Sequence, residues 1–134
     1  MVGSRRRNTE VVLDLLQKAN KPLTAYQILD LARPSGISAP PTIYRALQRL
    51  QRRGLVHRLE MLNAFVLCRE KESSGKLASF MLCEDCGTVE EIHDERLDQI
   101  FAEWRQRMSF TLTKQTVEML GHCQSCSQHP GKAA

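Results

Sequence analysis

Four cysteines form two C-x-x-C pairs that lie far apart in the chain. The first pair is Cys83 and Cys86, and the second is Cys123 and Cys126. Two such pairs are the ligand set of a tetrahedral zinc site, in which four thiolates close the coordination sphere and leave no position for catalysis. A redox disulfide of thioredoxin type would need a single C-x-x-C near a βαβ pattern. The spacing therefore predicts one structural zinc per chain, joining two turns of a domain in the C-terminal half.

The 134 residues are enough for one ordinary domain or two small lobes, and few of them are aromatic. A thin core of this kind suits a metal site and an oligomer interface. No stretch approaches the ~20 apolar residues of a membrane span, and the N-terminus lacks the apolar part of a signal peptide. Cysteines placed as metal ligands indicate a reducing compartment. We therefore expect a cytoplasmic protein that does not enter a membrane.

Charge is unevenly divided along the chain, whose formal net charge is +4. Residues 1–62 carry eleven Lys or Arg and four acidic residues, so this part has a net charge of +7 and the remainder −3. A basic lobe joined to a mildly acidic one is typical of a nucleic-acid-binding domain attached to a second domain. A solvated basic surface is the alternative, and charge alone does not decide between the two.

The pattern of the basic part predicts three helices followed by a hairpin. Apolar periodicity predicts the first helix over residues 10–19. Thr24 and Gln27 fit a capping box, so a second helix should begin there. After the third helix, two runs rich in β-forming residues predict a hairpin, with strands at residues 55–59 and 64–67.

The third helix has an apolar and a basic face. Prolines mark its start, and Gly54 follows its end. Its apolar stripe consists of Ile43, Leu47 and Leu50. The opposite face combines cations, an amide and a phenol, namely Tyr44, Arg45, Gln48, Arg49 and Arg52. Three helices and a wing, with a basic face on the third helix, predict a winged helix-turn-helix that inserts this helix into the major groove of DNA.

Arg45 is the residue that we expect to read a base, because a guanidinium pairs with O6 and N7 of guanine. Thr42 and Tyr44 lie at the start of the same helix, where they suit contact with a phosphate or a thymine methyl group. Further cations are expected at phosphates, which position a protein without specifying sequence. They are Arg49, Arg52 and Arg53. The alternatives are a packed Tyr44 and solvated arginines.

Beyond a charged hinge at residues 70–76, the pattern predicts a small sheet with one amphipathic helix. Strands are expected near residues 78–82, 88–93, 110–113 and 116–120, and a helix over residues 94–108. Each C-x-x-C turn follows a strand, which is where a metal can join the two turns. The predicted fold class is α+β, with a winged-helix domain at residues 1–69 and a small zinc-binding α/β domain at residues 77–134.

Several motifs together resemble the ferric uptake regulator (Fur) superfamily. They are Pro40-Pro41-Thr42-Ile43-Tyr44-Arg45-Ala46-Leu47, Gly54-Leu55-Val56-His57, Cys83-x-x-Cys86-Gly87 and Gly121-x-Cys123-x-x-Cys126. These motifs occur in order, and the resemblance covers the chain from about Val11 to Cys126. Within the superfamily the chain looks most like the zinc uptake regulator (Zur) branch, a set of metal-dependent bacterial repressors that control metal-uptake genes.

The resemblance implies a homodimer whose C-terminal domain is the dimerisation domain, a double-stranded DNA operator as partner, and Tyr26 as a further DNA-contacting residue. It also implies a second, regulatory zinc near the hinge. The ligands of that zinc map onto His57, Cys68, Lys76 and Glu91. Lys76 departs from the family pattern, because an ammonium must lose its proton before it can bind zinc. Our own inference is that His93, which period-two alternation places on the face of Glu91, could complete the set.

Other interpretations of these residues stay open. His93 could be a plain surface histidine, and Cys68 a small apolar residue of the interior. The chain could be a regulator of the same fold that has lost metal sensing, which Lys76 favours. A zinc hydrolase built on His57, Cys68 and Glu91 would have an open fourth position, but no base or nucleophile motif accompanies them. We therefore expect no enzyme activity and no small-molecule substrate.

Overall fold

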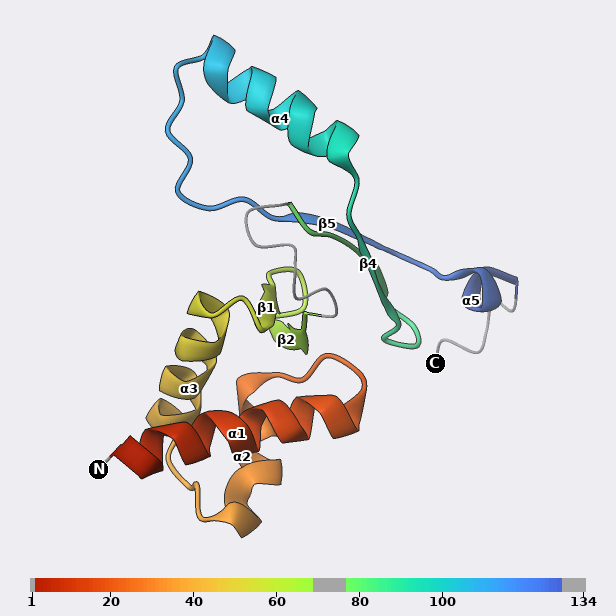
Figure 1. Ribbon diagram of the computed structural model, residues 1–134. Coiled ribbons are helices and arrows are strands. Elements are labelled where there is room, and N and C mark those ends of the chain that lie inside the picture. The colour runs from red at the N-terminus through yellow and green to blue at the C-terminus, as the bar shows by residue number, and fades with distance from the viewer. Residues whose placement is uncertain (1, 69–76, 129–134) are drawn as a thin grey trace. The chain divides into compact units, whose positions relative to one another are not determined.

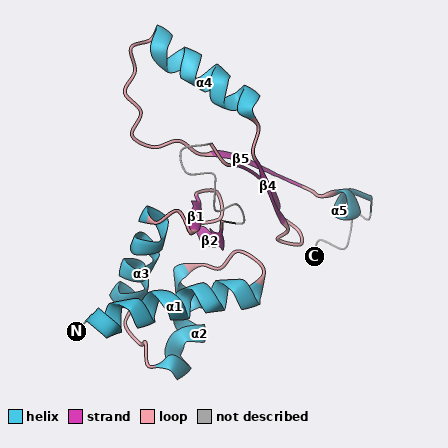
Figure 2. Ribbon diagram, in the orientation of Figure 1, coloured by secondary structure: helices cyan, strands magenta, loops and turns pink. Residues whose placement is uncertain are grey.

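The computed structural model describes residues 2–68 and 77–128 (Figure 1). The chain divides into two compact units, Met1–Lys71 and Glu72–Ala134. Helices and strands both contribute to the fold (Figure 2), and the predicted α+β class is confirmed. The hinge expected at residues 70–76, which includes Lys76, lies outside the described residues. Within the described ranges, no helix is long and apolar enough to cross a membrane.

The first unit consists of three α-helices, a short 3₁₀ helix and a two-stranded hairpin. In chain order they are α1 (Val2–Ala19), α2 (Ala25–Ala32), η1 (Arg33–Ser35), α3 (Pro40–Arg52), β1 (Val56–Leu59) and β2 (Ala64–Leu67). The two strands pair antiparallel, with Val56 opposite Leu67 and Leu59 opposite Ala64. This order of three helices and a hairpin is the winged-helix arrangement expected from the sequence.

Local sequence explains where α2 begins and where α3 begins and ends. Thr24 Oγ1 accepts a hydrogen bond from the N–H of Gln27 at 3.2 Å, and Gln27 Oε1 accepts one from the N–H of Thr24 at 2.9 Å, which confirms the capping box. Pro40 occupies the first turn of α3, where its missing N–H has no partner to lose. Gly54 follows α3 with φ of 71°, a left-handed conformation that glycine adopts without steric cost.

Apolar side chains from all three helices and the hairpin form the core of the first unit. Ile28, Ile43 and Leu50 are completely buried. Leu23 and Phe65 exchange two backbone hydrogen bonds, which attach the hairpin to the segment between α1 and α2. Burying one side chain of this size contributes roughly 1.5–3 kcal/mol relative to leaving it in water. The core holds α3 by its apolar face and leaves the opposite face in solvent.

The second unit is a three-stranded sheet with one long and one short helix. Its elements are β3 (Ser79–Cys83), β4 (Val89–Ile92), α4 (Glu95–Arg107), β5 (Val117–Gly121) and α5 (Gln124–Gln128). The strand order is β4-β3-β5, with β3 antiparallel to β4 and parallel to β5. The parallel pairing places Cys83 opposite Gly121, so both cysteine turns lie at the same end of the sheet.

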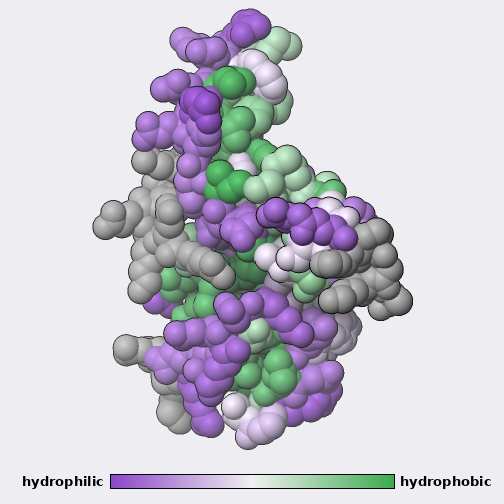
Figure 3. Space-filling view, turned by 90° about the vertical axis from the view of Figure 1, so that its right-hand side faces the viewer, coloured by the Kyte–Doolittle hydropathy of each residue, from purple (hydrophilic) through white to green (hydrophobic). Residues whose placement is uncertain are grey.

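Helix α4 is amphipathic, yet none of its side chains is buried. Trp104 is 53% exposed, although the ring of Phe101 contacts it edge to face at 5.2 Å between centroids. Met108, which follows the helix, is 74% exposed. In the space-filling view, apolar surface gathers on this unit (Figure 3). Contiguous exposed apolar surface marks an interaction site in a soluble protein.

Helix α1 begins at Val2, eight residues before the predicted start at residue 10. The apolar stripe that led to the prediction marks only part of the helix that packs on the core. Packing continues toward the N-terminus, because Thr9 is buried and the guanidinium of Arg7 donates a hydrogen bond to the carbonyl of Ser35 at 3.4 Å. The prediction of the first boundary was therefore wrong.

The strand expected at residues 110–113 is absent, and α5 was not expected. The N–H of Phe110 donates to the carbonyl of Arg105 at 2.8 Å, which continues the turn at the end of α4. No strand of the described sheet pairs with residues 110–113. Alternation of apolar and polar residues does not make a strand when no neighbouring strand supplies backbone hydrogen bonds.

Candidate metal centres and nucleic-acid interface

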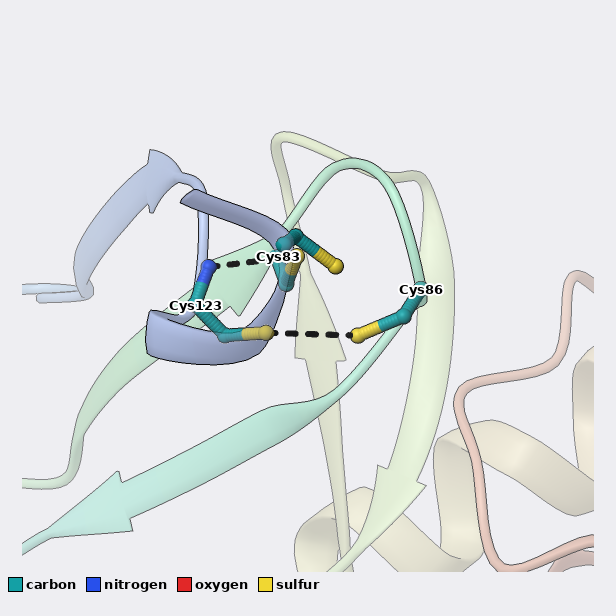
Figure 4. Close-up of side chains that lie close together, drawn as sticks. Cys83, Cys86 and Cys123 are labelled. Carbon is teal, nitrogen blue, oxygen red and sulfur yellow. Dashed lines mark hydrogen bonds between the residues drawn. The ribbon is translucent and has the colours of Figure 1, made fainter. Parts of the chain in front are cut away.

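The four predicted zinc ligands meet at one end of the sheet in the second unit. Cys83 ends β3, Cys86 lies in the turn before β4, Cys123 follows β5, and Cys126 lies in α5. Their sulfur atoms all lie within 4.8 Å of one another. The sulfurs of Cys86 and Cys123 face each other at 3.7 Å (Figure 4). Sulfurs about 2.3 Å from one zinc lie about 3.8 Å apart along the edges of a tetrahedron, so the spacing fits this metal.

Backbone hydrogen bonds hold the two cysteine turns together. The N–H of Gly87 donates to the carbonyl of Cys83 at 3.0 Å and closes the first turn, with Gly87 in a left-handed conformation at φ of 77°. The N–H of Glu84 donates to the carbonyl of Gly121 at 2.9 Å. The N–H of Cys123 donates to the sulfur of Cys83 at 3.3 Å. The last two bonds cross from one turn to the other, so the protein itself brings the four sulfurs together.

Hydrogen bonds shift the pKa values of the Cys83, Cys86 and Cys126 thiols. Backbone N–H donors, first that of Cys123 and then that of Cys86, lower the pKa of Cys83 to about 6. The hydroxyl of Thr88, 2.9 Å from the sulfur, lowers the pKa of Cys86. The neighbouring Cys123 thiol raises the pKa of Cys126. Zinc binds the thiolate form, and a divalent cation is what allows four neighbouring thiols to lose their protons together. The donor set therefore fits a structural zinc.

His122 is a residue at this centre that the sequence pattern did not single out. It directly precedes Cys123, and its ring contacts Asp85 and Glu84, which lie between the first two cysteines. The hydrogen bond to Asp85 raises the pKa of His122. Spacing rules for metal ligands overlook this histidine because its partners are carboxylates on the other turn.

The residues predicted for a regulatory metal fall into two pairs. In the first unit, donor atoms of His57 on β1 and Cys68 after β2 lie within 4.8 Å of one another. In the second unit, Nε2 of His93 lies 3.1 Å from Oε1 of Glu91, so these two side chains share a face as expected. The set of four draws on both units and stays a prediction.

The residues predicted to contact DNA all lie on the first unit. Tyr26, in the first turn of α2, is 65% exposed, and Tyr44 on α3 is 45% exposed rather than packed in the core. Arg45 and Arg52 are also exposed, whereas Thr42 and Arg49 are half-buried. No acidic residue occurs in α3, so its solvent face offers only cationic and neutral groups to a ligand. Their contacts with DNA stay predictions.

Comparison with known proteins agrees with this arrangement. The profile of the Ferric uptake regulator family matches residues 4–120. The zinc uptake regulation protein of Escherichia coli (strain K12) is 34% identical over 116 residues, which cover 86% of this chain and 68% of that protein. The zinc uptake regulation protein of Mycobacterium tuberculosis (strain H37Rv) is 26% identical over 121 residues, which cover 90% of this chain and 92% of that protein.

Solved structures of zinc uptake regulators also resemble this chain. A zinc uptake regulator complexed with zinc and DNA has a TM-score of 0.85 at 33% identity, covering 90% of this chain and 81% of that one. Holo XcZur has a TM-score of 0.82 at 36% identity, covering 90% and 84% of the two chains. The chain therefore belongs to the ferric uptake regulator family. Its members are transcription regulators and not enzymes, which sets aside the zinc hydrolase.

Proposed function

We propose that the protein is a zinc-responsive transcription repressor that binds operator DNA as a homodimer and controls metal-uptake genes. The proposal rests on one observation: the same chain contains a cluster of four cysteine sulfurs and a winged helix whose third helix exposes a basic face without acidic residues. Similarity to zinc uptake regulation proteins, and to a regulator solved with zinc and DNA, supports it. We place the protein in the cytoplasm, where reducing conditions keep the cysteines as thiols.

The first unit is the DNA-binding domain in this proposal. Helix α3 enters the major groove, and Arg45 pairs with guanine because its guanidinium donates to O6 and N7 together. Thr42 and Tyr44, in the first turn and a half of α3, contact a phosphate or a thymine methyl group. Phosphate contacts that set the register come from Tyr26, Arg49, Arg52 and Arg53.

The second unit holds the structural zinc through Cys83, Cys86, Cys123 and Cys126. Bound there, zinc cross-links the two cysteine turns and contributes folding free energy, because an unfolded chain offers no such site. Four protein ligands leave no position for substrate, so the role is structural. The same unit supplies the homodimer interface. Ile100, Trp104 and Met108 leave an apolar surface in water on each copy, and a second copy would cover it.

Regulation rests on the two donor pairs. We propose that His57 and Cys68 of the first unit, with Glu91 on β4 and His93 directly after it, hold a second, regulatory zinc. Sulfur and imidazole donors favour zinc over manganese or iron. Because DNA and this metal would select the same arrangement of the units, each would raise the affinity for the other.

One experiment tests the function directly. A duplex enriched from a random-sequence library by the zinc-loaded protein serves as the operator probe, and a shuffled duplex serves as the control. Fluorescence anisotropy at fixed salt compares protein that retains only its tightly held zinc with protein given excess zinc. We expect excess zinc to tighten binding to the enriched duplex at least about tenfold, a coupling of about 1.4 kcal/mol.

The second candidate is a regulator of the same fold that no longer senses metal. Lys76 favours it, because the resemblance places this residue among the regulatory ligands, and an ammonium must lose its proton before it can bind zinc. Equal affinity for the enriched duplex with and without excess zinc would support that candidate. Failure to distinguish the enriched duplex from the shuffled one would reject sequence-specific DNA binding altogether.

A further inference from the structure

A cluster of three charged or titratable side chains bridges the two cysteine turns without using a cysteine. Glu84 and Asp85 are the two residues between Cys83 and Cys86, and His122 directly precedes Cys123. His122 Nδ1 forms a hydrogen bond with Asp85 Oδ2, and His122 Nε2 lies 3.3 Å from Glu84 Oε1. Both ring nitrogens therefore face carboxylates that belong to the opposite turn.

The backbone around the histidine fixes this bridge. The carbonyl of Gly121 accepts a hydrogen bond from the N–H of Glu84 at 2.9 Å. This bond fixes the position of the first cysteine turn relative to the second. The hydroxyl of Ser127 donates to the carbonyl of His122 at 3.2 Å and attaches that residue to α5. The Asp85 side chain is only 12% exposed, whereas those of Glu84 and His122 are about half exposed. Asp85 is therefore the better shielded partner, and solvent weakens the contact with Glu84.

The bridge matters for the four sulfurs because two of them lie on each turn. Zinc release breaks the bonds to thiolates on both turns, so separation of the turns favours release. A contact between the same turns that does not use the cysteines resists that separation and returns a released sulfur to the metal. We infer that His122 is a positioning residue that clamps the two cysteine turns together and slows the release of the structural zinc. The inference rests on the proposed structural zinc.

A cation bound by Glu84, Asp85 and His122 is the competing explanation, since their donor atoms also lie within 4.8 Å of one another. The observed contacts favour the clamp. Both ring nitrogens of His122 already face carboxylate oxygens, whereas a metal would take a ring nitrogen away from its carboxylate. The experiment therefore includes a measurement that a cation site would change and a clamp would not.

The test measures zinc transfer from the full-length, zinc-loaded protein to the chromogenic chelator 4-(2-pyridylazo)resorcinol. We compare the wild type with His122→Ala, Asp85→Asn and the double variant, and Gln124→Ala on the other side of Cys123 is the control. We expect zinc release from His122→Ala to be roughly threefold to tenfold faster, because a half-exposed charge-assisted contact is lost. The double variant should be no faster than His122→Ala, because both changes remove the same bridge.

Four results would overturn the inference. Equal release rates in the wild type and His122→Ala would exclude a clamp, and so would an equal acceleration in Gln124→Ala. Additive acceleration in the double variant would show that the two side chains act separately. Binding of an additional Zn²⁺ or Mn²⁺ by the wild type, lost in His122→Ala, would identify a cation site instead. A fifth result, wild-type protein that contains no zinc when purified, would reject the structural zinc itself, whereas the first four leave the proposed function intact.

The variants must keep their fold for the rates to be compared. Zinc content before the chelator is added and the far-ultraviolet circular dichroism spectrum should match those of the wild type. His122→Gln provides a further comparison, because an amide can still donate to one of the two carboxylates. We expect its release rate to lie between those of the wild type and His122→Ala.

Discussion

The first unit is held together by apolar side chains, and the second by very few of them. In the first, Ile28, Ile43 and Leu50 are completely buried together with residues from α1 and the hairpin. Among residues 77–128, the buried side chains all lie on β3, and they are Ser79, Phe80, Leu82 and Cys83. Large apolar side chains of the second unit are instead exposed, such as Trp104 and Met119.

The difference shows which unit depends on something outside itself. A unit with a complete core can leave one helix face free for a ligand, as α3 does. A sheet with a thin core needs a metal, a partner or both, because burial of a few side chains does not offset the conformational entropy of the chain. The second unit offers sites for both, with four sulfurs at one end of the sheet and an apolar surface on α4.

Removal of one zinc ligand should have the largest effect. Structural zinc binds with an apparent free energy of roughly 10–16 kcal/mol, and a serine hydroxyl does not replace a thiolate. We expect Cys123→Ser to lose its zinc and the folded structure of the second unit, while the first unit stays folded. Amide signals in a two-dimensional NMR spectrum and elemental zinc analysis check this result, with Ser125→Ala as the control in the same turn. If the second unit stays folded without zinc, its fold does not depend on the metal, and the contrast drawn between the two units is wrong.

A cavity in the core should lower the stability of the first unit more than any substitution on its surface does. Leu50 is completely buried, so Leu50→Ala should lower the free energy of unfolding by roughly 2–5 kcal/mol. Urea denaturation followed by circular dichroism measures the effect. Met61, in the turn between β1 and β2, is 55% exposed, so Met61→Ala is the control. Similar losses in the two variants would show that the described core does not carry the stability of this unit.

Truncation of an exposed aromatic side chain on α4 should weaken the homodimer. Trp104 is the largest exposed apolar residue of the helix, and loss of a central interface aromatic costs about 2 kcal/mol or more. We expect the dimer dissociation constant of Trp104→Ala to rise at least about thirtyfold in sedimentation equilibrium. Gln99→Ala, on the same helix, should leave it unchanged. An unaffected dimer in Trp104→Ala would place the interface elsewhere.

Two arginines of α3 should differ in what they do to DNA binding. Arg45→Ala should lower the preference for the enriched duplex over the shuffled one by roughly 1–3 kcal/mol, because a base contact is lost. Arg52→Ala should weaken binding to both duplexes equally and reduce its salt dependence, because a phosphate contact is lost. Fluorescence anisotropy with the two duplexes separates the outcomes. An unchanged preference in Arg45→Ala would exclude base reading by this residue.

The smallest effect is expected at a helix start in the first unit. Thr24→Ala removes the side-chain oxygen that accepts from the N–H of Gln27, and such caps contribute about 1 kcal/mol. Urea denaturation should show a loss of this size. Thr24→Ser keeps the hydroxyl and should stay close to the wild type. A loss as large as that of Leu50→Ala would mean that the cap does more than begin α2.

The parts of the structure that could be predicted depend on neighbouring residues. The capping box of Thr24 and Gln27 and the apolar stripe of α3 are local patterns, and both are present as expected. The four cysteines could be predicted because C-x-x-C spacing fixes two sulfurs on one turn. Residues 110–113 could not, because a strand requires a partner that alternation does not reveal. The early start of α1 depends on contacts such as that between Arg7 and Ser35, which are distant in sequence.

In the candidate sites, too, the features that could be predicted depend on residues close in sequence, and the others depend on residues far apart. His122 escaped prediction because its role depends on Asp85, 37 positions earlier, and no spacing rule links the two. Glu91 and His93 were expected to share a face because strand residues two apart do so, and their side chains are in contact. The regulatory set as a whole combines residues from both units, so local patterns and the structure of each unit leave it a hypothesis.

The number of zinc ions per chain separates a zinc-sensing regulator from one that holds only a structural zinc. The protein is purified without chelator, titrated with zinc, freed of unbound metal and subjected to elemental analysis, and His57→Ala is treated in the same way. We expect a plateau near two zinc ions per chain for the wild type and near one for His57→Ala, because only the regulatory set would lose a ligand. A plateau at one in the wild type would contradict zinc sensing and leave a regulator that holds only its structural zinc.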